Sequence, residues 1–545
     1  MKRRILVIGL DGATFDVINP LINEGLMPNV KKLIGKGAVG SLQSTIPPLS
    51  APAWLSLATG IKPEKTGVFD FLNRQEDSFK LHGVNSEAYH SRSVWDYLCQ
   101  AGGRVGIFNY PLLRPTYKVK GFLTTGIGAS PYEEFTFPKN LKQQLHKIAG
   151  GRYEITVPYY NSRYENVDLF LKDLNRVFTK KVQATKFLLR SKKWDLFWVV
   201  FSETDWLQHI MWRHIDRDHP LYESAHSAKH AQSFKEFWNN IDESIGQFCS
   251  IVNDDTNVII LSDHGFGPND QVFKLNAWLE KEGYLVRKKP NIVRNLKNIK
   301  IKSFSLIDAI ARKINLGKLI APGLYTRFRE MAVSFRGSVL DQIDLGQSLA
   351  FDPGHTIPFG GIYINNKLVD THQEKQKLAG EIAAKLKDFG KKHGIQIRIS
   401  RLDNIYNGPD LLIGVNDWRC VIEKTQFRGK LFEKRPYSSR HSGSHRMNGI
   451  FIIAGPDIQN VSLGKLQIFD IAPTLLYLFG QPIPSSMDGQ VLEKIFSLKY
   501  LTRHAQKYQA QKKTIESDFI NKSSPSFAEQ EDDAIRKTLG DLGYL

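Results

Sequence analysis

The chain has 545 residues, of which 41% are hydrophobic and 11% aromatic, and this composition excludes an intrinsically disordered protein. Its formal net charge of +19 favours anionic partners, and its three scattered cysteines exclude a disulfide framework, so we expect a reducing compartment. The apolar run Ile5–Leu10 is too short for an export signal, and no stretch approaches the roughly 18 apolar residues of a membrane span, so we expect a cytoplasmic protein.

Two polar residues lie at the ends of predicted elements, one after the first strand and one before a helix. Arg4–Leu10 (RILVIGL) is a continuous apolar run that ends at Asp11, as expected for a strand buried in a parallel sheet. In Ser44–Gly60 the pair Pro47-Pro48 breaks any regular element and a helical pattern begins at Pro52, which places Ser50 just before a helix N-terminus. That position favours an anion such as a phosphoryl group, although an ordinary N-cap serine is the commoner case.

A second apolar run, Asp195–Phe201 (DLFWVVF), continues the α/β alternation that Val105–Tyr110 extends earlier in the chain. Polar residues follow it directly. If a helix begins there, Asp205 and His209 stand at i and i+4 on one face, close enough to bind one metal ion. Alone this spacing is a weak motif, but its place at the end of a buried strand strengthens it.

The third apolar run, Asn257–Gly267 (NVIILSDHGFG), ends in Asp263 and His264 before a glycine-rich bend. Ligands bind outside the carboxyl ends of parallel strands, so we expect both side chains at one site. The alternative is an Asp that caps the next turn beside a satisfied His. His445 precedes the strand-like Gly449–Gly455 and reaches the same edge only if that strand runs antiparallel, so we expect a mixed sheet.

A basic segment, Arg287–Arg336, carries thirteen lysines and arginines against two acids and holds more than half of the net charge. Within it, Leu306, Ile310 and Ile314 recur at helical spacing. Such a helix can cover an anionic substrate as a lid, lie on an anionic membrane surface, or form a plain solvated face. We favour the lid, with membrane contact as the second functional hypothesis.

Seven candidate residues share the chemistry of a metal-dependent site. They are Asp11, Ser50, Asp205, His209, Asp263, His264 and His445. Three carboxylates, three imidazoles and a hydroxyl suffice for two divalent metal ions around one substrate; N and O ligands suit Zn²⁺ best, with Mn²⁺ or Mg²⁺ as alternatives. Two such ions about 4 Å apart would clamp the attacking and leaving oxygens of a displacement at phosphorus.

These residues and their flanking motifs resemble the alkaline phosphatase superfamily, most closely its type I phosphodiesterase/nucleotide pyrophosphatase branch. The matching motifs stand in the family's order: VIGLDG (7–12), PPLSAPAWLSLATGIKPEKTGVFDF (47–71), DWLQH (205–209), SDHGF (262–266), GSHRMNGIFIIAGP (443–456) and FDIAPTLLYLFGQPIPSSMDGQVL (469–492). The resemblance leaves the basic segment and much of 72–190 unexplained.

The resemblance implies the roles of the seven residues. One metal would take Asp205, His209 and His445, and the other Asp11, Asp263 and His264, with the nucleophile Ser50 bound to the second metal. Two positions depart from related patterns. Nucleotide pyrophosphatases have Asn where this chain has Ala53, which puts a nucleotide substrate in doubt. Sulfatases have Arg where this chain has Trp54, which disfavours a sulfatase.

The resemblance also implies the fold: an α/β, alkaline-phosphatase-like core with a mostly parallel mixed sheet flanked by helices, and insertions that form a cap. Further helices are predicted at Pro28–Gly35, Asn276–Tyr284, Thr371–Phe389 and Ile468–Leu478, and strands at Gly360–Asn365, Ile395–Ser400 and Leu411–Val415. We divide the chain into core residues 1–285 (with an insertion at about 72–180), a basic helical insertion at 286–345 as the cap, core residues 346–495 (with a small α/β subdomain at about 360–415), and a polar helical tail at 496–545.

The predicted function is a two-metal hydrolase of phosphate esters, a diesterase or pyrophosphatase more than a monoesterase, acting through a phosphoserine on a phosphorylated small molecule or lipid. One alternative is a phosphomutase or phosphotransferase on the same core. Another is a catalytically inactive protein that binds anionic surfaces. Nucleic acid is not expected as a partner, and the sequence predicts no oligomeric state.

Overall fold

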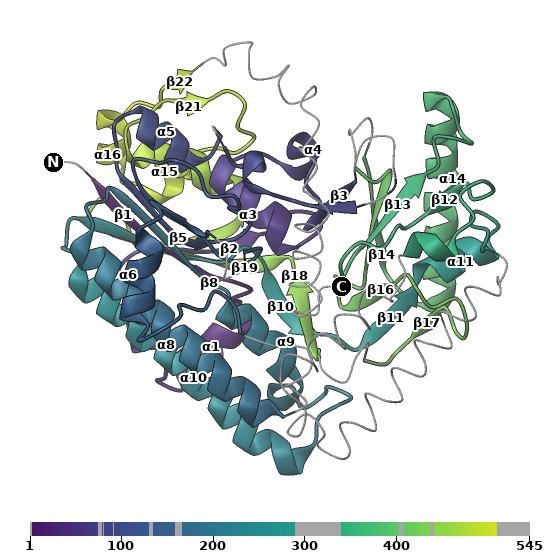
Figure 1. The fold of residues 1–545 in the computed structure, drawn as a ribbon, viewed down its shortest axis with the longest axis horizontal. Coiled ribbons are helices and arrows are strands. Elements are labelled where there is room, and N and C mark those ends of the chain that lie inside the picture. The colour runs from purple at the N-terminus through teal and green to yellow at the C-terminus, as the bar shows by residue number, and fades with distance from the viewer. Residues whose placement is uncertain are drawn as a thin grey trace.

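The computed structural model describes residues 3–74, 79, 81–90, 92–129, 134–157, 166–288, 339–402, 408–436 and 441–509. A nine-stranded central sheet carries helices on both faces, and a smaller outer subdomain lies beside it (Figure 1). In spatial order the strands are β20 (Val461–Gln467), β2 (Ala38–Gln43), β19 (Asn448–Ala454), β9 (Thr256–Leu261), β1 (Arg4–Leu10), β8 (Leu196–Phe201), β5 (Val105–Tyr110), β6 (Gly121–Thr125) and β7 (Thr136–Phe137). The predicted mixed α/β sheet is confirmed.

Three neighbouring parallel strands form the middle of this sheet. β1 pairs in parallel with β8 on one side and with β9 on the other. Every residue of β8 and β9 is buried, which explains the apolar runs Leu196–Phe201 and Val258–Leu261, because helices cover both faces. β19 runs antiparallel to both β9 and β2, as the position of His445 predicts.

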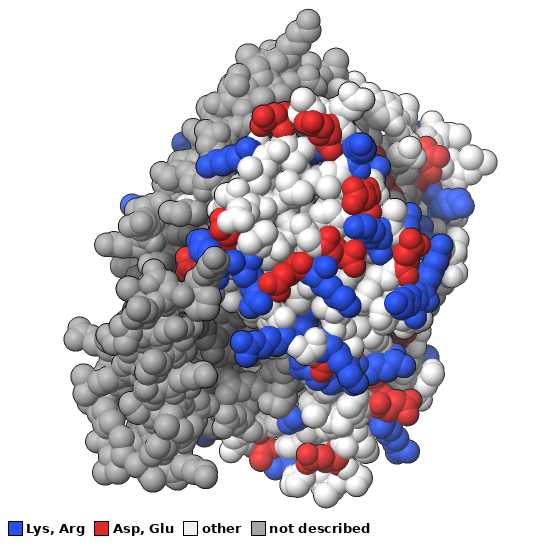
Figure 2. Space-filling model, turned by 90° about the vertical axis from the view of Figure 1, so that its right-hand side faces the viewer, with Lys and Arg blue, Asp and Glu red and all other residues white. Residues whose placement is uncertain are grey.

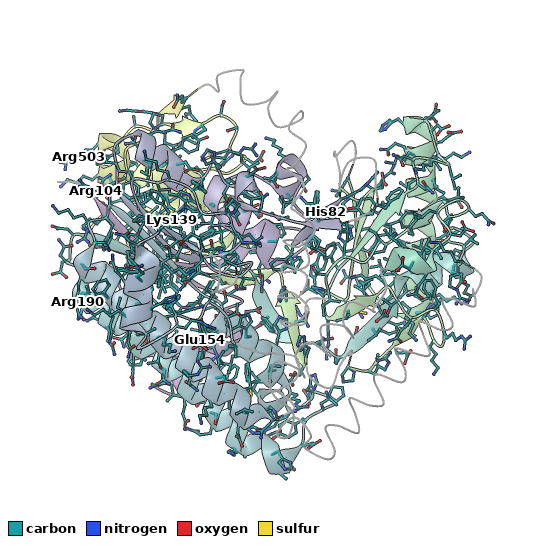
Figure 3. All side chains as sticks on the ribbon, viewed as in Figure 1. His82, Arg104, Lys139, Glu154, Arg190 and Arg503 are labelled. Carbon is teal, nitrogen blue, oxygen red and sulfur yellow. The ribbon has the colours of Figure 1, made fainter. Side chains whose placement is uncertain are left out.

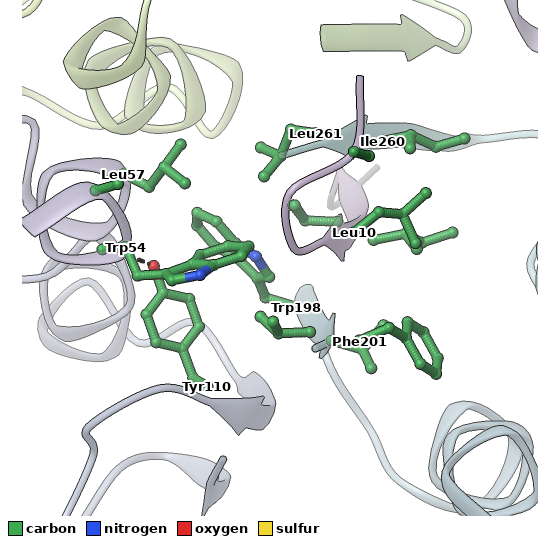
Figure 4. Close-up of a cluster of buried hydrophobic side chains, with 14 of the residues drawn as sticks. Leu10, Trp54, Leu57, Tyr110, Trp198, Phe201, Ile260 and Leu261 are labelled. Carbon is green, nitrogen blue, oxygen red and sulfur yellow. Dashed lines mark hydrogen bonds between the residues drawn. The ribbon is translucent and has the colours of Figure 1, made fainter. Parts of the chain in front are cut away.

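Helices pack against the sheet with their apolar faces inward. They are α1 (Phe15–Asn23), α2 (Pro28–Ile34), α3 (Ser50–Thr59), α5 (Val94–Gln100), α6 (Leu141–Ile148), α8 (Val167–Ser191), α9 (Glu203–Ile215), α10 (Ser224–Ile251) and α15 (Ile471–Leu478). Trp54 anchors α3 (Figure 4): its ring centroid lies 5.4 Å from that of Tyr110, whose hydroxyl donates to the Trp54 carbonyl at 2.7 Å. Tyr110 in turn lies 5.4 Å from Trp198 of β8. These contacts fix the helix that begins at Ser50.

The outer subdomain has a hydrophobic cluster of its own and two small sheets. Its elements are β11 (Gln271–Lys274), α11 (Leu275–Lys281), β12 (Ala350–Phe351), β13 (Gly360–Ile364), α14 (His372–His393), β14 (Ile397–Arg401), β15 (Leu411–Val415), β16 (Cys420–Glu423) and β17 (Phe432–Glu433). A separate two-stranded ribbon, β10 (Gly265–Pro268) with β18 (Gly443–Arg446), lies between it and the core.

A buried carboxylate, Asp70, joins the outer subdomain to the core. It accepts hydrogen bonds from His355 Nδ1 at 2.9 Å and from the backbone N–H of Thr356 at 2.8 Å. Figure 3 shows His82 on the side of the core that faces the outer subdomain, whereas Arg104 and Arg503 lie on the opposite side.

Two of the predicted domains lie mostly outside the described residues. Apart from Arg287 and Lys288, the basic segment 287–336 lies outside the described residues, as does the tail beyond 509. β5, β6 and β7 extend the central sheet within 72–180, so that range holds core strands as well as added segments. No helix within the described ranges is both long and apolar enough to cross a membrane.

The exposed face of the outer subdomain mixes both signs of charge. Figure 2 shows Lys and Arg side chains lying among Asp and Glu on this face. Ion pairs such as Lys385 with Glu282 and Arg435 with Glu433 contribute to that mixture. The described surface here therefore differs in character from the predicted basic segment.

Candidate metal centre

Five of the candidate residues come from the carboxyl ends of β1, β8 and β9. Asp11 follows β1, Asp263 and His264 follow β9, and Asp205 and His209 lie on α9, which begins two residues after β8. Because these three strands are parallel neighbours, their ends meet at one edge. All five side chains are buried. The predicted strand-end location is therefore observed.

The sixth candidate, His445, reaches the same edge through the β10–β18 ribbon. His445 pairs with Phe266 across the ribbon, two residues beyond His264. The rings of His264 and His445 stack with centroids 3.7 Å apart. β18 then leads into the antiparallel strand β19, which explains how a residue ahead of a strand can face the ends of parallel strands.

The seventh candidate, Ser50, is the first residue of α3, because the helix begins two residues before the predicted start at Pro52. Leu49 is the N-cap, so Ser50 does not cap the helix. Its Oγ lies 3.2 Å from His264 Nε2. The structure thus brings all seven predicted residues into one buried cluster.

The three imidazoles are held in the same way. Each Nδ1 faces a backbone carbonyl oxygen: that of Gly443 at 2.8 Å from His209, that of Gly265 at 3.0 Å from His264, and that of Pro48 at 3.1 Å from His445. A carbonyl only accepts, so Nδ1 carries the hydrogen and Nε2 is left with its lone pair. Fixing the tautomer by such a bond is typical of histidines that bind metals through Nε2.

The three Nε2 atoms point at the three carboxylates. His209 and His445 Nε2 lie 3.4 and 3.2 Å from the two oxygens of Asp205. His264 Nε2 lies 3.3 Å from Asp263 and 3.6 Å from Asp11. Two groups of atoms lie within 4.8 Å of one another and could each hold an ion: Asp205 with His209 and His445, and Asp11 with Asp205 and His264.

Burial and mutual repulsion make this cluster unfavourable without a cation. Burial, with Asp263 and Asp205 nearby, holds the pKa of Asp11 well above its usual value, and burial raises the pKa of Asp263 as well. Burial lowers the pKa of His209, and burial beside His264 lowers that of His445 to about 3, so both rings are neutral at pH 7. Ionising the clustered carboxylates beside these two neutral rings therefore calls for a cation among them.

The hydrogen bonding of the carboxylate oxygens also bears on whether the cluster suits a metal ion. Among the described residues, neither oxygen of Asp11 has a hydrogen-bond partner, and Oδ2 of Asp263 has none either. Buried charged atoms are normally paired, hydrogen-bonded or bound to a metal. The donor set of Asp and His side chains therefore fits divalent metal ions.

Several residues that hold the candidate ligands in place are not predicted from the sequence. Ser262 Oγ donates to the Ala13 carbonyl and accepts from the Ile450 N–H, both at 2.8 Å, which ties the ends of β1, β9 and β19 together. Thr204 Oγ1 donates to the Asp11 carbonyl at 2.6 Å. Gly12, at φ +68°, donates its N–H to Asp263. The sequence indicates these residues only by their position next to the candidate ligands Asp263, Asp205 and Asp11.

A family model supports the same interpretation. The model described as type I phosphodiesterase / nucleotide pyrophosphatase matches residues 5–315, more than half of the chain. The chain belongs to this family. It is accordingly a metal-dependent phosphoric ester hydrolase, and the predicted superfamily is confirmed. A search of curated proteins gives no significant match.

Solved structures are similar to the chain at low sequence identity. Phosphonoacetate hydrolase from Sinorhizobium meliloti 1021, in complex with phosphonoformate, is 13% identical with a TM-score of 0.51, over 86% of this chain and 94% of that one. Murine ectonucleotide pyrophosphatase / phosphodiesterase 5 is 11% identical with a TM-score of 0.48, over 91% of this chain and 100% of that one. The first of these structures and the family model confirm the predicted alkaline-phosphatase-like fold.

Proposed function

We propose that the chain is a two-metal hydrolase of phosphate diesters or pyrophosphates that acts through a phosphoserine intermediate. The observation that carries the proposal is the common arrangement of the three imidazoles. Each ties its Nδ1 to a carbonyl and turns its Nε2 toward buried carboxylates, beside the Ser50 hydroxyl. Such a cluster supplies N and O ligands in two sets and a nucleophile next to one of them.

The proposed ligand sets are those that the family resemblance implies. Asp205, His209 and His445 would hold one metal, and Asp11, Asp263, His264 and Ser50 would hold the other. Zn²⁺ suits these donors best, with Mn²⁺ or Mg²⁺ as alternatives. When bound, two divalent ions would neutralise the buried carboxylates, lower the pKa of the Ser50 hydroxyl and stabilise charge that develops on the phosphoryl oxygens.

Ser50 supplies the proposed nucleophile. Its Oγ forms a bond to phosphorus while the bond from phosphorus to the leaving oxygen breaks; the hydroxyl proton passes to water, and the leaving oxygen takes up a proton from water. A water molecule then attacks the phosphoserine, the bond between Oγ and phosphorus breaks, and the hydroxyl is restored. The Trp54 anchor holds α3, and with it Ser50, against β5 and β8 throughout.

The substrate remains a phosphorylated small molecule or lipid. Ala53, fully buried on α3, offers no polar group at the position where nucleotide pyrophosphatases have Asn. A direct test compares p-nitrophenyl phosphate, bis(p-nitrophenyl) phosphate and phosphonoacetate as substrates of the Zn²⁺-loaded protein. We expect the diester to give the highest kcat/KM, and acid quenching during its turnover to trap a p-nitrophenyl phosphoryl group on Ser50, detectable by mass spectrometry.

Two outcomes would contradict this proposal. Turnover of the diester without any phosphoserine would mean that water attacks phosphorus directly. Slow hydrolysis that accelerates when an alcohol acceptor is added, with transfer of the phosphoryl group to that alcohol, would identify a phosphotransferase on the same core.

A further inference from the structure

The β10–β18 ribbon carries one candidate metal ligand and directly follows another, yet it is small. Each strand has four residues, and within the described part of the chain the two strands form a sheet of their own. An isolated two-stranded ribbon is at best marginally stable in water. His264 and His445 therefore need further contacts if their rings are to keep a fixed separation.

Arg446 supplies such contacts. Its Nη1 donates to the carbonyls of Trp418 at 2.9 Å, His445 at 2.8 Å and Ser444 at 3.4 Å, and its Nη2 donates to the Pro268 carbonyl. One guanidinium thus joins both strands of the ribbon to the outer subdomain. His445 and Arg446 are neighbours on a strand, so their side chains leave opposite faces, and Arg446 points away from the candidate ligands.

The partner on the outer subdomain is an unusual turn. Asn416, Asp417 and Trp418 have φ angles of 49°, 51° and 65°, three consecutive residues in the left-handed region. Asn and Asp tolerate this conformation, but it is a genuine outlier for a bulky residue such as Trp. Strain of this kind persists only where surrounding contacts hold it.

Two contacts hold the Trp418 backbone in place. Its ring is buried in the hydrophobic cluster of the core, not in that of the outer subdomain, and its carbonyl accepts from Arg446. The turn itself is tied to the outer subdomain through Asn416, whose Nδ2 donates to Gln271 Oε1 at 2.6 Å. The turn and Arg446 together form a continuous link from the outer subdomain to the ribbon.

We propose that Arg446 is a positioning residue that fixes the β10–β18 ribbon, and through it His264 and His445, against the left-handed turn Asn416–Trp418. The inference rests on the proposed metal centre. Arginine is required because one planar guanidinium reaches four carbonyls, whereas a lysine ammonium has three donors on a single atom. Gly267 fits the same arrangement, because a Cβ there would lie 2.7 Å from Arg446 Nε.

The experiment compares Arg446→Ala and Arg446→Lys with the matched control Arg435→Ala. Arg435 is a half-buried arginine of the outer subdomain that bonds Glu433 and the Pro436 carbonyl, away from the ribbon. Zn²⁺ dissociation constants for both sites are measured by competition with a chromophoric chelator, and kcat and KM are measured with bis(p-nitrophenyl) phosphate.

We expect both Arg446 variants to bind both Zn²⁺ equivalents about 10- to 100-fold more weakly, as for the loss of outer contacts to metal ligands. At saturating Zn²⁺, kcat should stay about tenfold low with KM nearly unchanged. Millimolar guanidinium should restore Zn²⁺ affinity in Arg446→Ala, and methylammonium should not. Arg435→Ala should match the wild type.

Three outcomes would overturn the inference. In the first, Arg446→Ala lowers only Tm, and its Zn²⁺ affinity and kcat stay within twofold of the wild type. The second is full function in Arg446→Lys, and the third is the same loss in Arg435→Ala. If Arg446→Ala does not fold, Gly267→Ala serves as the second variant, because its added Cβ displaces the guanidinium. It should also weaken Zn²⁺ binding, and an unchanged Zn²⁺ affinity in Gly267→Ala would reject the positioning role of Arg446. A wild type that binds no Zn²⁺ would reject the metal centre itself.

Discussion

The central sheet and the outer subdomain both bury short apolar strands, but they orient them differently. In the core, β9, β1 and β8 run in parallel, so their carboxyl ends meet at one edge. In the outer subdomain, β13, β15 and β14 run antiparallel, and successive carboxyl ends lie at opposite edges. Parallel order therefore gathers polar residues that follow strands, whereas antiparallel order disperses them.

This difference explains the distribution of the candidate residues. The core and the ribbon supply all seven candidate residues, and the outer subdomain supplies contacts to the core through Asp70 and Arg446. The chemistry should therefore fail when one of the candidate residues changes, whereas a change at the Asp70 contact with the outer subdomain should affect stability. Four experiments test this division, from the largest expected effect to the smallest.

Replacing the nucleophile should have the largest effect. Ser50→Ala should lower kcat for a diester by about 1,000-fold or more, because the phosphoserine cannot form, while two Zn²⁺ ions still bind. Steady-state kinetics and metal analysis check this. Ser56→Ala, a buried serine of the same helix whose Oγ bonds the Ile61 carbonyl, is the control and should stay within about tenfold of wild type. Equal activity in wild type and Ser50→Ala would show that no covalent intermediate is needed.

Removing a ligand should cost one metal ion. His264→Ala should bind about one Zn²⁺ instead of two and lose about 100-fold or more in kcat, because its Nε2 faces Asp11, Asp263 and Ser50. Equilibrium dialysis with metal analysis measures the stoichiometry. His393→Ala, an exposed histidine on α14 of the outer subdomain, should retain both ions. Two tightly bound ions in His264→Ala would place this ring outside the metal centre.

Replacing the Asp70 carboxylate, which joins the outer subdomain to the core, should lower the stability of the fold. Asp70 accepts from His355 Nδ1, Thr356 N and Thr356 Oγ1, and these bonds lower its pKa despite burial. Asp70→Asn should lower the free energy of unfolding by about 2 kcal/mol, because an amide cannot accept all of these bonds. Urea unfolding measures it, with Zn²⁺ stoichiometry unchanged. A loss of bound Zn²⁺ without a loss of stability would contradict the assigned division of roles.

Acidification of the metal-free protein should give the smallest effect. Burial beside His264 lowers the pKa of His445 from 6.5 to about 3 in the folded state. The unfolded chain therefore binds a proton below pH 6.5 that the folded chain excludes, and stability falls as the pH drops from 6.5 toward 3. Urea midpoints at pH 7.5 and pH 5 measure this loss. The difference between the two urea midpoints should become smaller in His445→Gln and stay unchanged in His393→Gln. The reverse result would assign the titration to the outer subdomain.

The sequence predicts the core better than its surroundings for physical reasons. Buried parallel strands must be apolar on both faces, so β1, β8 and β9 stand out as unbroken runs, and the polar residues after them indicate the site. The antiparallel direction of β19 follows from where His445 must lie. Helix α10 is not predicted, because its apolar stripe begins only at Phe234, well after its start at Ser224.

Other parts of the site depend on contacts that no local pattern reveals. Arg446 bonds backbone carbonyls, which every residue carries, so its partners Trp418 and Pro268 leave no signal in sequence. The placement of Ser50 inside the first turn of α3 depends on Leu49 as N-cap, a residue without a capping side chain. The ligand roles of all seven residues stay predictions until metal binding is measured.

The position of β19 also sets an order of events during synthesis of the chain. β19 lies between β2 and β9, although it is made long after both. Until Asn448–Ala454 emerges, these two earlier strands have no common neighbour, and their unpaired edges are templates for aggregation. At about 5–20 residues per second, the nascent sheet stays open for roughly 10–40 s after β9 is complete. His445 arrives with the same segment, so the ribosome-bound chain gains its full ligand set only as its sheet closes.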